Sequence, residues 1–355
     1  MPNFWTTLPK PIIALAPMAG VCDSAFRQIC RAHGADVIYT EFLSADALIH
    51  GNLKTREMLK FNPAEKPIVC QIFGKNPESI ARAAKIVEAE GYDGLDLNFG
   101  CPAYKVVKSG GGVSLMRNLN KVYDVIAATQ TAVQIPVSIK IRARIGREAR
   151  IRDMILCRDA EDEKLENEGE VTALDLLEKI QDLNVPAIML HARSYEQPFD
   201  GVPDLDMVSA VRQIYKGILL TNGGIYTPQE AKRQLDATGA DGCGLARGAL
   251  GNPWLFQQIK DCLTNNANPT EILKFRNSEP PDSLHYTTPT WNDIKKTMLQ
   301  HAQLALQIKG EQSIIELRKH MAWYIKAMPG AKELRSKLVQ VKTLADIEKA
   351  LADWQ

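Results

Sequence analysis

The sequence predicts an α/β fold: a (β/α)₈ or TIM barrel followed by a small C-terminal helical bundle. Eight short runs are hydrophobic throughout their centres, as parallel strands covered on both faces are, and helix-like segments such as residues 77–90 separate them. These units occupy 252 residues, from 12 to 263, close to the usual barrel size of about 250 residues. From residue 291 onward the pattern is wholly helical.

The expected strands also allow a second arrangement, a doubly wound open sheet. In chain order the strands cover residues 12–18, 37–42, 67–74, 94–98, 136–142, 187–193, 217–225 and 239–247. An open dinucleotide-binding sheet would carry G-x-G-x-x-G after its first strand, but that turn reads Pro17-Met18-Ala19-Gly20. We therefore favour the closed barrel.

Net charge and cysteine usage limit the class of protein. The 355 residues contain 43 Lys and Arg against 42 Asp and Glu, a formal charge of +1, so any nucleic-acid site must be local. Seven cysteines form an odd set without a C-x-x-C pair, which argues against a disulfide framework and a zinc knuckle. No run approaches the roughly 18 apolar residues that span a bilayer. We expect a cytoplasmic protein with no membrane segment and no metal, and a monomer is favoured.

Charge and proline content divide the chain. Residues 144–170 hold six Lys or Arg against nine Asp or Glu, and we interpret them as a surface insertion after the fifth strand. Residues 264–290 contain four prolines and form the expected linker. Residues 291–355 carry eleven Lys or Arg against seven Asp or Glu, a net charge of +4, and residues 318–326 mix cations with aromatic rings as RNA-contacting surfaces do. The expected domains are therefore a barrel over 1–263 and a basic helical domain over 291–355.

Polar side chains gather at the ends of the expected strands. In a barrel these ends converge on one mouth, where barrel enzymes keep their chemistry. A single polar loop residue means little, but polar or special residues at all eight ends favour an active site there. In chain order they are Pro17 with Met18, Glu41, Gln71, Asn98 with Cys101, Lys140 with Arg142, His191 with Arg193, Asn222 and Arg247.

Cys101 lies on the loop that follows the fourth strand. Gly100 and Pro102 flank it, and three glycines follow at 110–112, so the sequence predicts a flexible loop rather than a packed face. The other six cysteines are typical of a buried core. The residues alone leave two roles open for Cys101, a thiolate nucleophile or a thiol acid.

The ends of the seventh and eighth strands predict an anion site. Asn222-Gly223-Gly224 ends one strand, and Ala246 and Arg247 end the other. Small residues allow backbone N–H groups to approach a phosphate, and the guanidinium adds a charged fork, as in the usual barrel phosphate site. The phosphate belongs either to a substrate or to a cofactor.

Lys140 and His191 end the two strands between Cys101 and this anion site. Burying a lysine is costly without an anionic partner, so we expect Lys140 to face an anionic or electron-poor group. His191 is either part of the site or a satisfied core residue.

Six segments together resemble the tRNA-dihydrouridine synthases. They occur in the expected order over nearly the whole chain, and residues 318–324 are similar to the helical tail of the family's B-type bacterial branch. The six segments are Ala16-Pro17-Met18-Ala19-Gly20-Val21, Gln71-Ile72-Phe73-Gly74, Asp96-Leu97-Asn98-Phe99-Gly100-Cys101-Pro102, Ile139-Lys140-Ile141-Arg142, Leu190-His191-Ala192-Arg193 and Asn222-Gly223-Gly224-Ile225.

The resemblance implies an FMN-containing barrel that reduces a uridine of tRNA to 5,6-dihydrouridine, with NADPH as the usual reductant. It implies a catalytic barrel and a tRNA-binding helical domain. The residues that it assigns to FMN are Pro17, Met18, Ala19, Gln71, Lys140, His191, Asn222, Gly223, Gly224, Ala246 and Arg247. It assigns Asn98, Lys105 and Arg142 to the uridine, and Cys101 to proton donation.

The chemistry of that reaction suits Cys101 as an acid. A hydride added to uracil C6 leaves negative charge on C5 and the adjacent carbonyl, so a proton donor is needed at C5. A thiol with an ordinary pKa of about 8.5 is mostly protonated at neutral pH. One departure from the family pattern is Ala246, where glycine is common, and its Cβ constrains the approach of the backbone to a phosphate.

Two other functions share part of this pattern. A small-molecule FMN oxidoreductase of the dihydropyrimidine or dihydroorotate type would have the barrel and the flavin but would not need a basic helical tail. A non-catalytic RNA-binding protein on an inherited barrel would not need to retain Cys101, Lys140, His191 and Arg247. We therefore expect a tRNA-modifying oxidoreductase.

Overall fold

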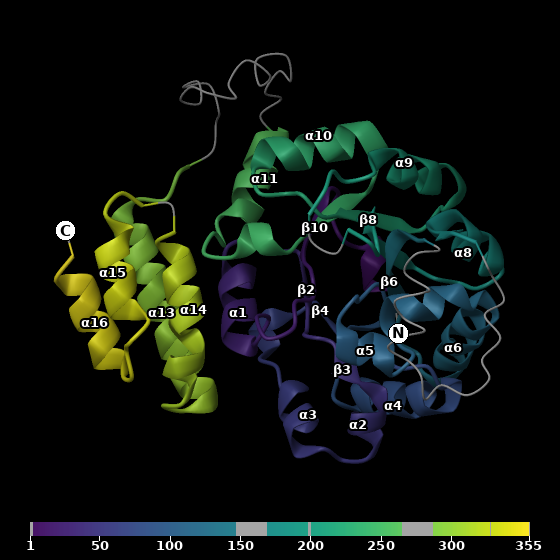
Figure 1. The fold of residues 1–355 in the computed structure, drawn as a ribbon, viewed down its shortest axis with the longest axis horizontal. Helices are drawn as coiled ribbons and strands as arrows, with labels where there is room; N and C mark the ends of the chain where they lie inside the picture. Colours follow the sequence, from purple (N-terminus) through teal and green to yellow (C-terminus); the bar gives the residue numbers. More distant parts are fainter. Residues whose placement is uncertain (1–2, 147–168, 198–199, 265–286, 327, 355) are drawn as a thin grey trace.

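A closed barrel of eight parallel strands forms the centre of the computed structural model, which describes residues 3–146, 169–197, 200–264, 287–326 and 328–354 (Figure 1). The strands are β1 (Ile12–Leu15), β2 (Val37–Tyr39), β4 (Ile68–Phe73), β5 (Gly94–Phe99), β6 (Val137–Ile145), β8 (Ala187–Ser194), β9 (Ile218–Asn222) and β10 (Gly242–Leu245). They pair in this order, and β10 returns to β1 with Gly242 opposite Ile12. The predicted (β/α)₈ barrel is confirmed, and each predicted strand overlaps one of these eight.

Two short strands of the structure were not predicted. β3 (Leu43–Ser44) adds to β4, and β7 (Val171–Thr172) pairs antiparallel with the end of β6. This second pairing gives Arg144 and Ile145 backbone partners, so β6 continues past its predicted end at residue 142.

Side chains fill the barrel interior and close its N-terminal end. Interior residues that include Tyr39 and Met189 form one hydrophobic cluster with Trp5. Trp5 is 1% exposed and lies in a 3₁₀ turn whose Phe4 ring approaches Gly94 at the start of β5. The interior is therefore a packed core, and the C-terminal end of the barrel is left to form a site.

Helices surround the barrel, and local capping explains how several of them begin. They are α1 (Ser24–Ala32), α2 (Ala45–Ile49), α3 (Leu53–Met58), α4 (Pro77–Ala89), α5 (Tyr104–Lys108), α6 (Leu119–Ala132), α8 (Ala173–Lys179), α9 (Leu205–Ile214), α10 (Pro228–Thr238) and α11 (Leu255–Thr264). Asn76 caps α4, which Pro77 opens as the sequence predicts. Thr227 and Glu230 form a capping box on α10, which ends at Gly239 in a left-handed conformation.

The C-terminal region is the predicted helical bundle. It comprises α13 (Trp291–Lys309), α14 (Ser313–Tyr324), α15 (Ala331–Leu338) and α16 (Leu344–Ala352), which share a hydrophobic core beside the barrel (Figure 1). The bundle packs against α1, where the Phe26 ring lies 5.9 Å from the His301 ring and 4.9 Å from the His320 ring. The core of the predicted insertion, 147–168, and most of the predicted linker, 265–286, lie outside the described residues.

The described residues contain neither a candidate membrane span nor a candidate metal cluster. None of the helices among them has the length and apolar character needed to cross a membrane. None of their His, Cys, Asp and Glu side chains form a group of three or more that could hold a metal ion.

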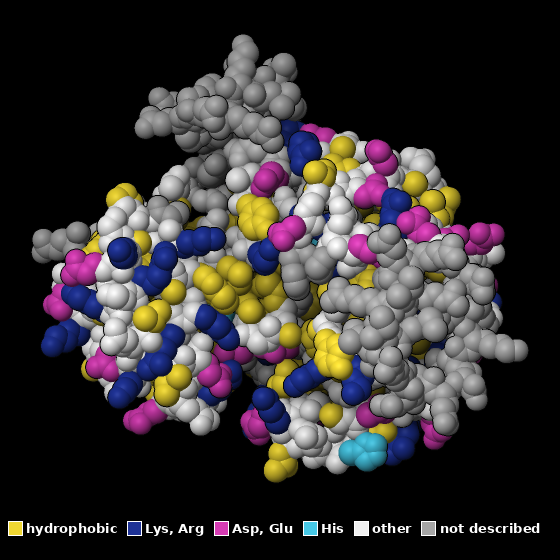
Figure 2. Space-filling view, in the orientation of Figure 1, with side chains coloured by type: hydrophobic (Ala, Val, Ile, Leu, Met, Phe, Trp, Pro, Cys, Tyr) yellow, Lys and Arg dark blue, Asp and Glu magenta, His cyan; other side chains and the backbone are white. Residues whose placement is uncertain are grey.

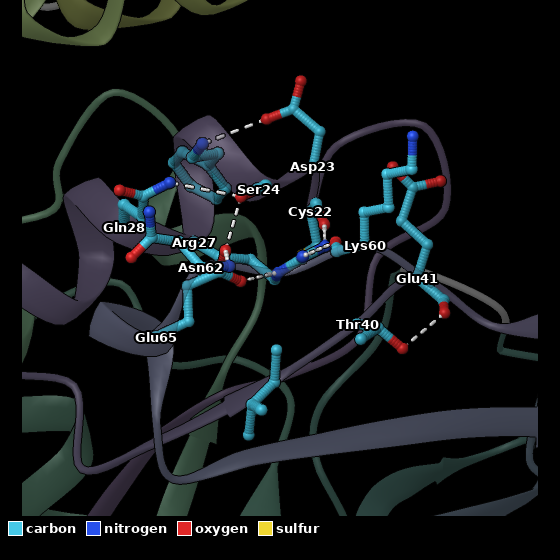
Figure 3. A network of polar contacts seen from close by, with 12 residues as sticks. Cys22, Asp23, Ser24, Arg27, Gln28, Thr40, Glu41, Lys60, Asn62 and Glu65 are labelled. Carbon is cyan, nitrogen blue, oxygen red and sulfur yellow. Dashed lines mark hydrogen bonds and ion pairs between the residues drawn. The ribbon is translucent and has the colours of Figure 1, made fainter. Parts of the chain in front are cut away.

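A buried ion pair fixes the start of α1 (Figure 3). Arg27 Nε donates to Glu65 at 2.5 Å, and both side chains are at most 3% exposed. Arg27 also donates to the Cys22 carbonyl at 2.8 Å, while Glu65 accepts from the Ser24 hydroxyl and the Asn62 backbone N–H. Because each charge is also hydrogen-bonded, the pair joins the β1–α1 loop to the segment before β4 without stranding a buried charge.

Replacing Arg27 by Met would leave Glu65 as a buried carboxylate without its cation. We expect Arg27→Met to lower the free energy of unfolding by about 3–5 kcal/mol, measured by urea denaturation. The double variant Arg27→Met/Glu65→Gln removes the stranded charge. Its loss should therefore be smaller than the sum of the two single losses, by about 0.5–3 kcal/mol. Strictly additive losses would show that the two side chains do not stabilise the fold as a pair.

Candidate active site

A cavity of about 550 Å³ lies at the C-terminal end of the barrel. The predicted site residues that line it are Pro17, Met18, Ala19, Gln71, Asn98, Cys101, Lys140, Arg142, His191, Asn222, Gly223, Gly224, Ala246 and Arg247. Two predicted residues lie outside the lining: Lys105, which is exposed on α5, and Glu41, whose Oε2 accepts from the Gly20 N–H at 2.7 Å. Closure of the parallel barrel brings these distant strand ends into one wall.

Hydrogen bonds fix the orientation of Gln71 and Asn98. Gln71 Nε2 donates to Asp96 Oδ2 at 2.7 Å, and Asn98 Nδ2 donates to Gln71 Oε1 at 2.8 Å. Asp96 is fully buried and also accepts from Ser138 Oγ at 2.7 Å. Burial raises the pKa of Asp96 to about 6, although both hydrogen bonds oppose that rise. The chain of bonds therefore presents two fixed amides at the cavity.

The loop that carries Cys101 is held from both sides. Asn98 Oδ1 accepts from the N–H groups of Gly100 and Cys101 at 3.1 and 2.9 Å, and Arg142 Nε donates to the Gly100 carbonyl at 2.8 Å. Gly112 has a φ of +62°, and a Cβ there would lie 2.7 Å from the Cys101 carbonyl oxygen. This glycine, predicted to make the loop flexible, instead allows the loop to pack closely.

The surroundings of Cys101 favour its protonated form. The side chain is half-buried, and burial raises the pKa of its thiol. A backbone hydrogen bond and the charges of Lys140 and Arg142 act in the opposite direction, but the net shift is upward. Of the two roles that the sequence left open, this environment suits the thiol acid better than the thiolate nucleophile.

Lys140 joins three strands at the cavity wall. Its Nζ donates to Asn222 Oδ1 at 3.2 Å, and Asn222 Nδ2 donates to the Gly244 carbonyl at 2.7 Å. Burial and, second, repulsion by Arg142 lower the pKa of Lys140 to about 8. The amide oxygen of Asn222 is a neutral partner, so it does not balance the lysine charge.

Four cationic side chains line the cavity: Lys140, Arg142, Arg193 and Arg247. No Asp or Glu occurs among the lining residues that the structure describes. Burial, followed by the charges of these four groups, lowers the pKa of His191 far below its ordinary value, so the imidazole is neutral. The geometry therefore makes a cavity that selects an anion.

Glycines open one part of this wall. Gly223 and Gly224 have φ values of +105° and +71°. A Cβ on Gly223 would lie 2.7 Å from His191 Cδ2, and a Cβ on Gly224 would lie 2.7 Å from Pro203 Cγ. Since only glycine fits both positions, bare backbone lines the cavity beside the cations, which is what a phosphate needs for close approach.

Comparison with known proteins shows the family of the chain that forms this cavity. A model described as Dihydrouridine synthase (Dus) matches residues 14–354. The chain belongs to the dihydrouridine synthase family. This membership confirms the predicted family and the prediction of an enzyme, because the family is one of oxidoreductases.

Two relatives of this dihydrouridine synthase family member cover most of its length. Similarity to tRNA-dihydrouridine synthase B of Pseudomonas aeruginosa extends over 331 residues at 30% identity, 93% of this chain and 88% of that protein. Probable tRNA-dihydrouridine synthase 1 of Synechocystis sp. is 29% identical over 333 residues, 93% of this chain and 82% of that protein.

A solved structure shares the barrel. The complex of 2-naphthoyl-CoA reductase with 2-naphthoyl-CoA matches with a TM-score of 0.51 at 10% identity, and the match covers 74% of this chain. The match covers 51% of that larger chain, so this dihydrouridine synthase family member spans about half its length. At this identity the likeness shows the fold alone.

Arg193, predicted at the end of the sixth strand but without an assigned role, lines the cavity; it lies two positions after His191 on β8 and so shares its face. Other residues of the cavity were not predicted as part of the site. Phe42 and Tyr226 follow strand ends, and Trp323 comes from α14 in the helical bundle. Trp323 belongs to the cation–aromatic segment that the sequence singled out, but nothing local in the sequence predicts that it lies at the barrel.

The cation–aromatic segment 318–326 is largely occupied by contacts inside the chain. Arg318 donates to the backbone of the α15–α16 loop at 2.8 Å, and Lys319 donates to the Gly20 carbonyl. Tyr324 is 4% exposed within the bundle core. These side chains dock and stabilise the bundle. We therefore expect any contact of this segment with RNA to come from its other residues.

Lys140→Met tests the cost of burying this charge. Unfolded lysine has a pKa of about 10.4, so between about pH 8 and 10.4 the unfolded chain binds more protons and wild-type stability rises with pH. We expect Lys140→Met to stabilise the ligand-free protein at pH 7 by about 1–3 kcal/mol, less than the full shift because Lys140 faces the cavity. The gain should vanish near pH 10.5 in urea denaturation. A constant difference between the two proteins from pH 7 to 10.5 would contradict the assignment.

Proposed function

We propose that this protein reduces a uridine of tRNA to 5,6-dihydrouridine, with FMN in the cavity and NADPH as the reductant. The observation that carries the proposal is the coincidence, in one cavity of this family's barrel, of four cations, bare glycine backbone and a half-buried thiol whose pKa is raised by burial. The relatives described above bear the name tRNA-dihydrouridine synthase, which supports the same substrate.

The residues present fit FMN. A cavity of about 550 Å³ is within the range of about 300–1,000 Å³ that holds cofactors. Gly223, Gly224 and Arg247, with Arg193 beside them, would hold the phosphate, while Lys140 would face the polar edge of the ring. The remaining residues assigned to the cofactor by resemblance are Pro17, Met18, Ala19, Gln71, His191, Asn222 and Ala246, all in the same lining.

Within the site, each residue near the uracil has a separate task. Bound FMN supplies the hydride that adds to uracil C6. Cys101 gives its proton to C5, where the negative charge develops. Asn98 and Arg142 hold the Cys101 loop, and we assign the second amide hydrogen of Asn98 to a uracil carbonyl. Lys105, outside the lining, is assigned to the RNA beyond the cavity.

The two domains divide the work. We assign catalysis to 1–263 and tRNA binding to 291–355, with 264–290 as their linker and 144–170 as an insertion at the substrate side. Figure 2 shows Lys and Arg side chains spread over the bundle, whose net charge of +4 favours phosphate contacts. Those contacts offset the few kcal/mol that extruding a stacked uridine costs. We also propose that the protein acts in the cytoplasm.

Cys101→Ala removes the proposed acid. We expect it to retain FMN and tRNA binding while dihydrouridine formation falls by about 10²–10⁴-fold, measured by mass spectrometry of tRNA after incubation with NADPH. Cys262→Ala is the matched control, because that cysteine is buried on α11 and does not line the cavity. Equal rates for the wild type and Cys101→Ala would remove Cys101 from the acid role.

Arg247→Met tests the proposed phosphate site. Losing a charge-assisted contact to the phosphate should weaken FMN binding by about tenfold or more in a fluorescence titration of the flavin-free protein. Lys326→Met, which removes an exposed lysine of the bundle, should leave FMN affinity unchanged. A wild-type protein that folds but takes up no FMN would refute the cofactor assignment.

A further inference from the structure

Trp323 is a residue of the helical bundle that lines the cavity of the barrel. It is half-buried near the end of α14 and lines the same cavity as Ala19 and Arg247. The other lining residues that the structure describes lie between positions 16 and 250, all within the barrel. One aromatic residue of the basic domain therefore lines the cavity built by the barrel.

The backbone around Trp323 is seated on the barrel. Gly251 has a φ of +71°, and a Cβ there would lie 2.2 Å from the Trp323 carbonyl oxygen. The next residue, Tyr324, is buried with its ring 6.3 Å from that of Trp254. The end of α14 is thus packed tightly on the segment between η4 (Arg247–Ala249) and α11, which fixes where the indole can lie.

The contact of the indole with His320 covers at most one of its two faces. Its ring centre lies 4.9 Å from that of His320 at an angle of 72°, an edge contact rather than a parallel stack. Trp323 lines the cavity together with Tyr226, whose ring lies 5.9 Å from the Arg247 guanidinium. A flat π surface and phosphate-binding charge therefore occur in one wall.

We propose that Trp323 is a stacking site for the nucleobase that flanks the reduced uridine in the RNA; this inference rests on the proposed function. Extruding a uridine leaves its neighbours with an unstacked face, and aromatic side chains bind such faces with little dependence on base identity. A flanking base suits the position better than the flavin does. The residues proposed for FMN all belong to the barrel, whereas Trp323 belongs to the domain proposed for RNA.

Stacking and phosphate binding differ in their dependence on salt. A phosphate contact releases a counterion, so its loss flattens the salt dependence of affinity, whereas the loss of a stacked base lowers affinity equally at every salt concentration. Lys326, three residues after Trp323 and exposed, provides the phosphate-type comparison. Trp354, which packs on Trp291 at 4.6 Å and does not line the cavity, provides the aromatic control.

The experiment measures binding of an unmodified tRNA transcript to the FMN-loaded full chain from about 50 to 200 mM salt. Trp323→Ala and the space-filling Trp323→Leu should raise Kd by about 5- to 150-fold at each salt concentration, and Trp323→Phe by less than about threefold. Lys326→Met should instead lower the salt slope by nearly one. Trp354→Phe should bind as the wild type does, and FMN content and Tm should be unchanged in every Trp323 variant.

Three results would overturn this assignment. Wild-type Kd in both Trp323→Ala and Trp323→Leu removes the stacking site and leaves the proposed function standing. Loss of FMN from these variants, with the tRNA affinity of the flavin-free protein unchanged, assigns the ring to the cofactor wall instead. If the wild type neither binds nor reduces tRNA, the proposed function itself fails, and the stacking site fails with it.

Discussion

Positively charged side chains dominate the lining of the cavity at the mouth of the barrel. Lys140, Arg142, Arg193 and Arg247 line one cavity, and no described residue of the lining is acidic. The cost is visible in the pKa values of Lys140 and Arg142, which burial, above all, lowers to about 8 and about 10. Burying these cations destabilises the ligand-free fold, and a bound anion would stabilise it again. The electrostatics therefore favour a phosphate-bearing ligand independently of family membership.

The loop between β1 and α1 connects this charged site to the helical bundle. Residues 17–19 line the cavity, whereas Gly20 accepts from Lys319 of α14 and Asp23 pairs with Lys309 of α13 at 3.0 Å. Each exposed contact contributes little alone. Their common location nevertheless gives the cavity and the bundle one shared wall, which is how a domain with its own hydrophobic core supplies a ring to a site built by the barrel.

The fold was predictable because its signals are local, and most of the site followed from barrel closure. Apolar strand centres revealed the eight strands, and a closed parallel barrel must bring their polar ends together. The direction in which a side chain points was harder to predict. Lys105 is close to Cys101 in sequence, but it lies on α5 and is exposed at the surface. The role of Lys319 depends on a carbonyl distant in the chain, and the place of Trp323 depends on the docking of two domains. Neither of these long-range contacts produces a periodic pattern in the sequence.

A thiol near several cations would ordinarily lose its proton, so the state of Cys101 depends on which effect is larger. Burial raises its pKa by more than Lys140 and Arg142 lower it. An anion bound in the cavity moves the balance further the same way, because its charge offsets the cations that would stabilise a thiolate. The same anion returns the pKa of Lys140 toward its ordinary value. Occupation of one anion site therefore keeps the proton on Cys101 and the charge on Lys140, the two states on which the proposed reduction of a uracil ring relies.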